Sequence, residues 1–150
     1  MKLFTTCVLL IGSLTAYADR PIPTTPEELT KTVQAAFANA DLEIAAIIAI
    51  PDNERTFENT IGAIDSMIAR LDEGANMSLF MGYVHPDAAI REAATAGEQY
   101  WSEWAVDFAT NEALYNAVKA YADRNPILEG EQARLLRHTL RDYKRSGMML

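Results

Sequence analysis

Apolar side chains recur at helical spacing in the middle of the sequence, and no segment alternates as a β-strand would. One run is spaced by four, three, four and three positions: Phe57, Ile61, Ile64, Ile68 and Leu71. Such spacing forms one face of an amphipathic helix. Because strand-like segments, internal repeats and low-complexity tracts are also absent from the sequence, it predicts an all-α fold. We expect helical hairpins that form an elongated bundle.

Turn and capping residues divide the chain into helical segments. Thr25-Pro26 starts the first, with Glu28 completing a capping box, and Pro51 ends it near Ile50, with or without a break at 39–41. The hydroxyl of Thr56 is placed to cap the second helix, with Gly74 interrupting it before a short helical piece at 76–84. The remaining segments are predicted from Pro86 to about Ala109, from Asn111 to about Ala122, and from about Glu129 to Ser146.

The last two long segments have distinct apolar faces. Small residues alternate with large ones along the segment that begins at Pro86: Ile90, Ala94, Gly97, Trp101, Trp104 and Phe108. Such a face lets another helix approach closely. The final helix is expected to bury Leu135, Leu136, Leu140 and Tyr143, with Gly147 just past its end.

The N-terminus has the pattern of a secretory signal peptide at residues 1–18. Lys2 precedes an apolar run from Leu3 to Leu14, and Ala16-Tyr17-Ala18 is a small-x-small cleavage site. The run is shorter than the roughly 20 residues that span a bilayer. We therefore expect export to a periplasm or the cell exterior, a short lead-in at 19–25, and one helical module at 26–150. The single cysteine, Cys7, would leave with the signal, which excludes disulfides and cysteine metal sites from the mature chain.

Charge is unevenly distributed along the mature chain. Residues 19–123 hold 18 acidic and 6 basic side chains, whereas residues 124–150 hold 3 acidic and 6 basic ones. The acidic balance argues against nucleic acid and, once the signal is removed, against a membrane as partner. The final helix nevertheless carries a basic edge: Arg134, Arg137, Arg141 and Arg145. The simpler interpretation of this edge is a solvated helix face. The more specific interpretation is a surface that binds an acidic partner.

Few residues are candidates for chemistry, and we assign no catalytic, cofactor-binding or metal-binding residue. His85 precedes Pro86, where a turn or capping role is expected, and His138 stands four positions before Asp142, which favours a structural pair over half of a metal site. Glu129 and Glu131 open a helix, where carboxylates complement the helix dipole. Neither H-E-x-x-H, G-x-S-x-G nor a phosphate-binding loop occurs.

Aromatic residues cluster on the segment that begins at Pro86. Four of them fall at helical spacing: Tyr100, Trp101, Trp104 and Phe108. They could line a ligand groove, but aromatic residues at this spacing are more often part of the core.

Two stretches have a recognisable order of residues: RTFENTIGAID at 55–65 and ARLLRHTLRDYKRSG at 133–147. They resemble the N-terminal helical region of the thimet oligopeptidase and oligopeptidase A family of zinc metallopeptidases. The run LYNAV at 114–118 is also similar to the family's sequences, so the resemblance covers about residues 26–150. Neither motif binds a metal, and each is specific through its order and separation.

The resemblance implies a structural role within a larger enzyme. In the family, two helical halves enclose a channel that admits short peptides, and zinc is held by H-E-x-x-H and a later glutamate. No position here matches a catalytic residue, so zinc is expected in a catalytic domain that this sequence lacks. The resemblance implies a structural role for Thr56 and Asn59, which match family residues at the start of a helix. It also implies a structural role in the last helix for Arg134, Arg141, Asp142 and Gly147.

Two functions remain open from the sequence. The chain is expected to be the non-catalytic N-terminal part of a secreted zinc metallo-oligopeptidase, inactive alone, with its basic edge toward the catalytic half and residues 148–150 starting a connection. The alternative is a stand-alone secreted helical-bundle binding or adaptor protein, in which Met148 to Leu150 fold back onto the core.

Overall fold

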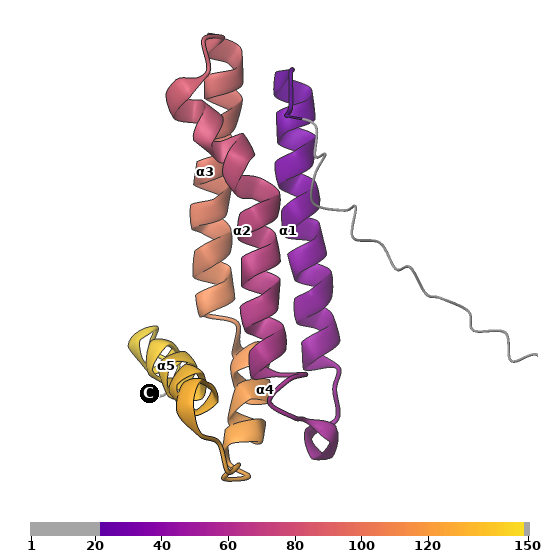
Figure 1. Cartoon of the computed structure of the whole chain (residues 1–150), viewed down its shortest axis with the longest axis vertical. Helices are drawn as coiled ribbons and strands as arrows, with labels where there is room; N and C mark the ends of the chain where they lie inside the picture. The colour runs from indigo at the N-terminus through magenta and orange to yellow at the C-terminus, as the bar shows by residue number, and fades with distance from the viewer. Residues whose placement is uncertain (1–21, 149–150) are drawn as a thin grey trace, which may run out of the picture.

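The protein is described here by a computed structural model that covers residues 22–148. These residues form α1 (Pro26–Ile48), a 3₁₀ turn η1 (Asp52–Glu54), α2 (Ile61–Val84), α3 (Ala88–Ala109), α4 (Glu112–Ala122) and α5 (Gly130–Arg145). Helices α1, α2 and α3 lie side by side along the long axis, α4 continues below α3, and α5 crosses the lower end (Figure 1). Over the described range the predicted all-α fold is confirmed. The predicted signal peptide lies outside this range.

Helix α1 begins as predicted and is unbroken. The Thr25 hydroxyl oxygen accepts the Glu28 amide at 3.2 Å. The carboxylate of Glu28 accepts the Thr24 amide at 2.9 Å, so the reciprocal bond reaches one residue further back than in a standard capping box. The helix runs through positions 39–41 and ends at Ile48, two residues before the predicted end.

The predicted cap of α2 at Thr56 is wrong by four residues, because the N-cap position is Thr60. Thr56 and Asn59 do bond reciprocally: the Thr56 amide donates to Asn59 Oδ1 at 2.7 Å, and the Asn59 amide donates to Thr56 Oγ1 at 3.2 Å. These bonds close a turn rather than open the helix. The Gly62 amide donates to the Phe57 carbonyl at 2.8 Å, which spans five residues instead of four, so α-helical geometry begins only at Ile61.

The predicted interruption of α2 at Gly74 is also wrong, because the helix continues to Val84. Leu71 and Ala75 are buried on either side of the glycine, and this packing outweighs the roughly 1 kcal/mol that glycine costs within a helix. Of the predicted apolar stripe, Ile61, Ile64 and Leu71 are buried, and Phe57 is half-buried in the turn before α2. Ile68 is 41% exposed. Met67, one position earlier, is fully buried in its place.

Small residues bring α3 close to its neighbours, as predicted. A Cβ atom added at Gly97 would lie 2.7 Å from Leu79 Cδ2 of α2 and 3.6 Å from Val33 Cγ1 of α1. A Cβ atom at Gly82 of α2 would lie 3.4 Å from the Cβ of Ala94. These contacts join the three long helices around one core.

Helix α5 is less buried than predicted. Of its four predicted core residues only Tyr143 is buried, at 6% exposure, whereas Leu135, Leu136 and Leu140 are half-buried. The reason is its position: α5 lies across the lower end of the bundle, where its main contacts are with α4 and α2 (Figure 1). The predicted glycine stop is confirmed, because Gly147 has φ +88° and the Met148 amide donates to the Tyr143 carbonyl at 3.1 Å.

Met148 packs partly against the core, which places one residue of the 148–150 tail; Met149 and Leu150 are outside the described range.

Candidate interaction surface

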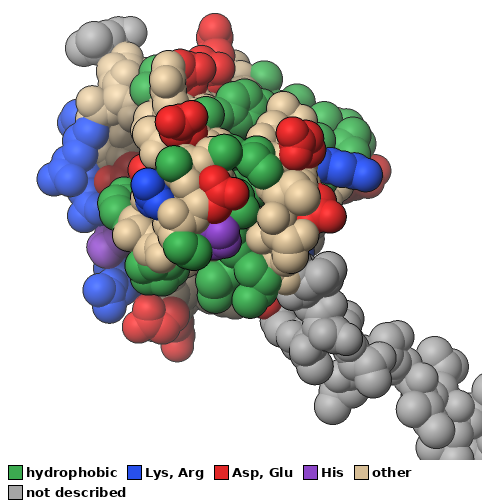
Figure 2. Space-filling view, turned by 90° about the horizontal axis from the view of Figure 1, so that it is seen from above, with side chains coloured by type: hydrophobic (Ala, Val, Ile, Leu, Met, Phe, Trp, Pro, Cys, Tyr) green, Lys and Arg blue, Asp and Glu red, His purple; other side chains and the backbone are tan. Residues whose placement is uncertain are grey.

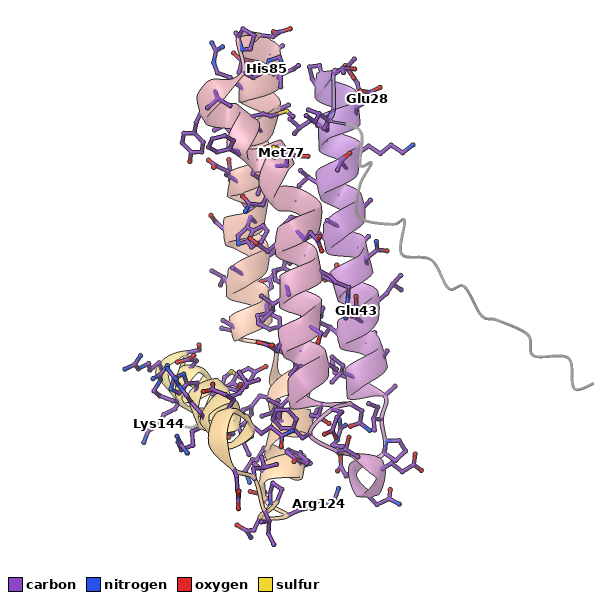
Figure 3. All side chains as sticks on the ribbon, in the orientation of Figure 1. Glu28, Glu43, Met77, His85, Arg124 and Lys144 are labelled. Carbon is purple, nitrogen blue, oxygen red and sulfur yellow. The ribbon has the colours of Figure 1, made fainter. Side chains whose placement is uncertain are left out.

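The surface under consideration is the exposed side of α5, which combines charge with incomplete burial. Arg134, Arg137, Arg141 and Arg145, the basic edge, are all exposed. Lysine and arginine side chains gather on one side of the molecule in Figure 2, and Figure 3 shows Lys144 projecting from α5. Cations in the last turn of a helix also complement its dipole.

Two members of the basic edge form ion pairs within α5. Arg134 Nη1 lies 3.9 Å from Glu131 Oε1, and Arg141 Nε donates to Asp142 Oδ1 at 3.0 Å. The bond from Arg141 holds the pKa of the Asp142 carboxyl below its usual range, with smaller contributions from the charges of Arg145 and His138. These exposed pairs contribute little to stability, so the edge is a charged surface rather than a structural element.

The donor set on α5 does not fit a zinc ion. His138 and Asp142 share the helix, but the Asp142 carboxylate is bonded to Arg141. Across residues 22–148 there is no group of three or more His, Cys, Asp or Glu side chains that could hold a metal ion.

The other ionisable candidates have structural positions. Nδ1 of His85 accepts the Asp87 amide at 3.1 Å, and Asp87 in turn caps α3, so the predicted turn role of His85 is confirmed. Glu129 occupies the N-cap position of α5 without a side-chain capping bond, and Glu131 lies in the first turn.

Arg55 belongs to the first resemblance motif and is buried, at 3% exposure. Its guanidinium donates from Nη1 to the Ile47 carbonyl at 3.0 Å and from Nη2 to the Ile48 carbonyl at 3.2 Å. These carbonyls lie in the last turn of α1, and the Ile47 carbonyl also accepts the Ile50 amide at 3.3 Å. Nε donates to Asp52 Oδ1 at 2.9 Å. Arg55 thus fixes the connection from α1 to α2, a role that the sequence analysis missed.

Arg124 links the same connection to α4. Its Nη1 donates to the Arg55 carbonyl at 2.6 Å and to the Asp52 carbonyl at 3.3 Å. Figure 3 shows Arg124 at the lower end of the molecule, where the α1–α2 connection and the chain after α4 meet. The two arginines join the α1–α2 connection to the C-terminal end of α4.

Tyr143 anchors α5 in a small hollow. The hollow, of about 160 Å³, is lined by residues of α2, α3 and α5: Ile64, Ile68, Phe108, Ala109, Thr139, Asp142, Tyr143 and Ser146. The Tyr143 ring lies 5.4 Å from that of Tyr115, centroid to centroid. Its buried hydroxyl has no hydrogen-bond partner among the described residues, and burial raises the pKa of Tyr143 to about 12.

The aromatic residues of α3 lie at the edge of the core rather than within it: Trp101, Trp104 and Phe108 are half-buried against the core, and Tyr100 is 44% exposed. Phe37 of α1 meets three of their rings edge-on, with centroid distances of 4.9 Å to Tyr100 and 5.4 Å to Trp101 and to Trp104. Trp104 stacks on Phe108 at 5.1 Å and donates from Nε1 to Asp41 Oδ1 at 2.8 Å. The cluster therefore packs α3 against α1.

No helix within residues 22–148 combines the length and the hydrophobicity needed to cross a membrane.

Comparison with known proteins gives one weak relationship. No protein-family model matches the chain. The chain is similar to a thimet-like oligopeptidase from Dictyostelium discoideum, with 27% identity over 133 residues, which is 85% of this chain. It spans only 20% of the length of that protein. The relationship to thimet-like oligopeptidases is therefore loose and concerns a small part of such a protein.

Proposed function

We propose that the chain is a non-catalytic helical part of a thimet-oligopeptidase-like metallopeptidase, forming one wall of a channel for short peptides. The observation that carries this proposal is the similarity to one fifth of a thimet-like oligopeptidase. The resemblance motifs support a structural role, because Arg55, Thr56 and Asn59 hold the α1–α2 connection together. Catalysis and zinc binding would be the task of another part of the enzyme.

In this proposal the outer side of α5 contacts the catalytic part. Three observations support it: the half-buried leucines of α5, the exposed basic edge, and the peripheral position of the helix. Half-buried leucines leave apolar area that a partner can cover. The arginines would pair with carboxylates of that partner and set its orientation.

Complementation between two chains tests this function. The full chain is added to the Dictyostelium thimet-like oligopeptidase from which the matching segment has been removed, and cleavage of a quenched short peptide is followed. We expect restored, chelator-sensitive cleavage, and none from the chain alone. Replacing Arg134, Arg137 and Arg141 by Glu should abolish the restoration, whereas replacing three exposed acids elsewhere, Glu73, Glu92 and Glu112, by Gln should not.

Two results would contradict the proposal. One is zinc-dependent cleavage by the chain alone, because the residues described hold no metal site. The other is failure of complementation by a chain that binds the truncated enzyme normally.

The runner-up function is a self-contained helical binding protein. It is favoured by the core of the bundle of α1 to α4, in which Phe37, Met67, Leu114 and Val118 are fully buried. A cooperative unfolding transition of a soluble monomer, together with failed complementation, would favour this function.

Export remains part of the proposal, resting on the signal pattern of residues 1–18. Mass spectrometry of the protein recovered from the periplasm or medium should find Asp19 as its first residue. A chain that stays in the cytoplasm with Met1 to Ala18 attached would contradict export.

A further inference from the structure

A groove lined by aromatic side chains lies between α2 and α3, toward the end of the bundle opposite α5. It is called the aromatic groove here and has a volume of about 410 Å³. Its lining comes from both helices: Asp72, Asn76, Leu79, Phe80, Tyr83, Glu98, Trp101 and Ser102. Figure 3 shows Met77 on upper α2, the part of the helix that forms the groove, whereas Lys144 marks the distant α5.

Apolar side chains around the aromatic groove are unusually exposed. Phe80 is 51% exposed, Tyr83 70%, Met77 59% and Val84 59%. Met77, Phe80 and Val84 are separated by three and four positions, so they share one face of α2. The Phe80 and Tyr83 rings lie 6.5 Å apart, centroid to centroid. A contiguous apolar surface of this kind, bordered by polar residues, is typical of an interaction site.

The floor of the aromatic groove is fixed by the core. The Trp101 ring packs edge-on against buried Phe37 at 5.4 Å, so its position does not depend on an occupant. Leu79 packs against the backbone of Gly97, where a Cβ atom would lie only 2.7 Å from Leu79 Cδ2. The groove is therefore preformed, which lowers the entropy lost when a partner binds.

The border of the aromatic groove is acidic. Asp72 of α2 and Glu98 of α3 stand in its lining, which contains no lysine or arginine. Interaction with the Glu98 carboxylate raises the pKa of the Tyr83 hydroxyl. The segment around it, residues 19–123, carries three times as many acids as bases. This field attracts cations and repels an anionic membrane or nucleic acid.

We propose that the aromatic groove binds a cationic amphipathic peptide segment. An apolar side chain of the peptide enters between Phe80 and Trp101, and its lysine or arginine side chains pair with Glu98 and Asp72. This mode combines an apolar anchor with charge complementarity, as in the docking of amphipathic helices into grooves. The inference does not rest on the proposed function, because it concerns the isolated chain and the end of the bundle away from α5.

Fluorescence anisotropy with a labelled peptide tests the inference. The probe is a 14-residue amphipathic helix of leucine and lysine, titrated with the full chain. We expect saturable binding that weakens as salt is raised. Phe80→Ser and Glu98→Gln should each weaken it about tenfold, a loss of roughly 1.4 kcal/mol. Val106→Ser is the matched apolar control, since Val106 is 62% exposed on α3 outside the groove, and Glu131→Gln on α5 is the charge control.

Three outcomes would overturn the inference. Binding that Phe80→Ser and Val106→Ser leave equally strong would show attraction to the acidic surface in general. Equal affinity for the same peptide with glutamate in place of lysine would remove the role of charge. Self-association of the chain that Phe80→Ser abolishes would show that a second copy covers the groove. Circular dichroism of each variant confirms that its helices are intact.

Discussion

Single side chains hold the lower end of this molecule together, and Tyr143 is the one whose environment is least satisfied. Its ring anchors α5 against Tyr115, yet its hydroxyl is buried without a hydrogen-bond partner among the described residues. A buried polar group in this condition costs roughly 1–3 kcal/mol. The ring therefore stabilises the docking of α5 while the hydroxyl opposes it.

Replacing Tyr143 by Phe should accordingly stabilise the fold at neutral pH, by about 1 kcal/mol. The pKa of Tyr143, about 12, lies above the ordinary value of 10, so ionisation of the phenol opposes folding. The contribution of the protonated Tyr143 phenol to the free energy of unfolding is fully present below pH 10. It is lost as the pH rises toward 12, by up to about 3 kcal/mol. Urea unfolding at pH 7 and at pH 11 measures both effects.

The decisive quantity is the difference in free energy of unfolding between wild type and Tyr143→Phe. Burial also raises the pKa of Tyr121, so its ionisation lowers stability over the same alkaline range. We expect the variant to lose less stability than wild type between pH 10 and 12. Tyr100→Phe, at an exposed position, should leave the alkaline loss unchanged. Equal alkaline losses in wild type and Tyr143→Phe would contradict this account.

Arg55 supports the lower end through three hydrogen bonds from one buried guanidinium. Arg55→Met should lower the free energy of unfolding by about 2–4 kcal/mol, because it removes the buried guanidinium that donates to the Ile47 and Ile48 carbonyls and to Asp52. Arg55→Lys should recover little, since an ammonium group cannot reproduce the planar fork. Chemical denaturation gives these values, and exposed Arg137→Met should cost under about 0.5 kcal/mol. A similar small loss for Arg55→Met would show that solvent replaces its bonds.

Sequence patterns predicted caps better than buried charges. The roles of Thr25, Asn111 and His85 could be predicted because each bonds to a backbone amide within three residues, so the spacing alone identifies the bond. Arg55 reaches back seven and eight residues across a proline turn, which no local spacing rule captures. The unpartnered hydroxyl of Tyr143 depends on the positions of three helices and has no sequence signal at all.

At the scale of elements, helix ends show where local and tertiary forces compete. Three apolar stripes were recognisable from their period, but Thr56 closes a turn instead of starting α2, and Gly74 does not end it. Core contacts decide both cases, and they involve residues far apart in sequence. The aromatic groove was likewise hidden, because Phe80 and Trp101 were assigned to different helices and their approach depends on Gly97.

Helix α5 is the element most open to improvement, because Glu129 gives it no side-chain cap. Glu129→Ser should stabilise α5 by up to about 1 kcal/mol, through a hydroxyl that accepts an amide of the first turn. The gain should appear as slower amide exchange within Gly130–Arg145, with little change for α1. Thr25→Ala, which removes a cap that is present, should produce the opposite change in α1. Unchanged exchange in α5 after Glu129→Ser would mean that another group already satisfies these amides.

For the molecule as a whole, stability is concentrated in the bundle of α1 to α4 and charge separates along it. Fully buried side chains come from these helices, whereas α5 contributes Tyr143 and half-buried leucines. The acidic bundle and its basic last helix attract each other, but exposed charges contribute little to such docking. The arrangement predicts that α5 opens without unfolding the rest.

Matched leucine deletions can test this division. Leu71→Ala, at 3% exposure in the core, should cost about 3 kcal/mol of global stability, whereas Leu136→Ala on α5 should cost about 1 kcal/mol or less. Native-state hydrogen exchange should show the second loss confined to α5 amides, because opening of α5 leaves the core of the other helices intact. Were α5 amides to exchange only with the global free energy of unfolding, α5 would be an integral part of the core. The half-buried leucines would then no longer indicate a surface that awaits a partner.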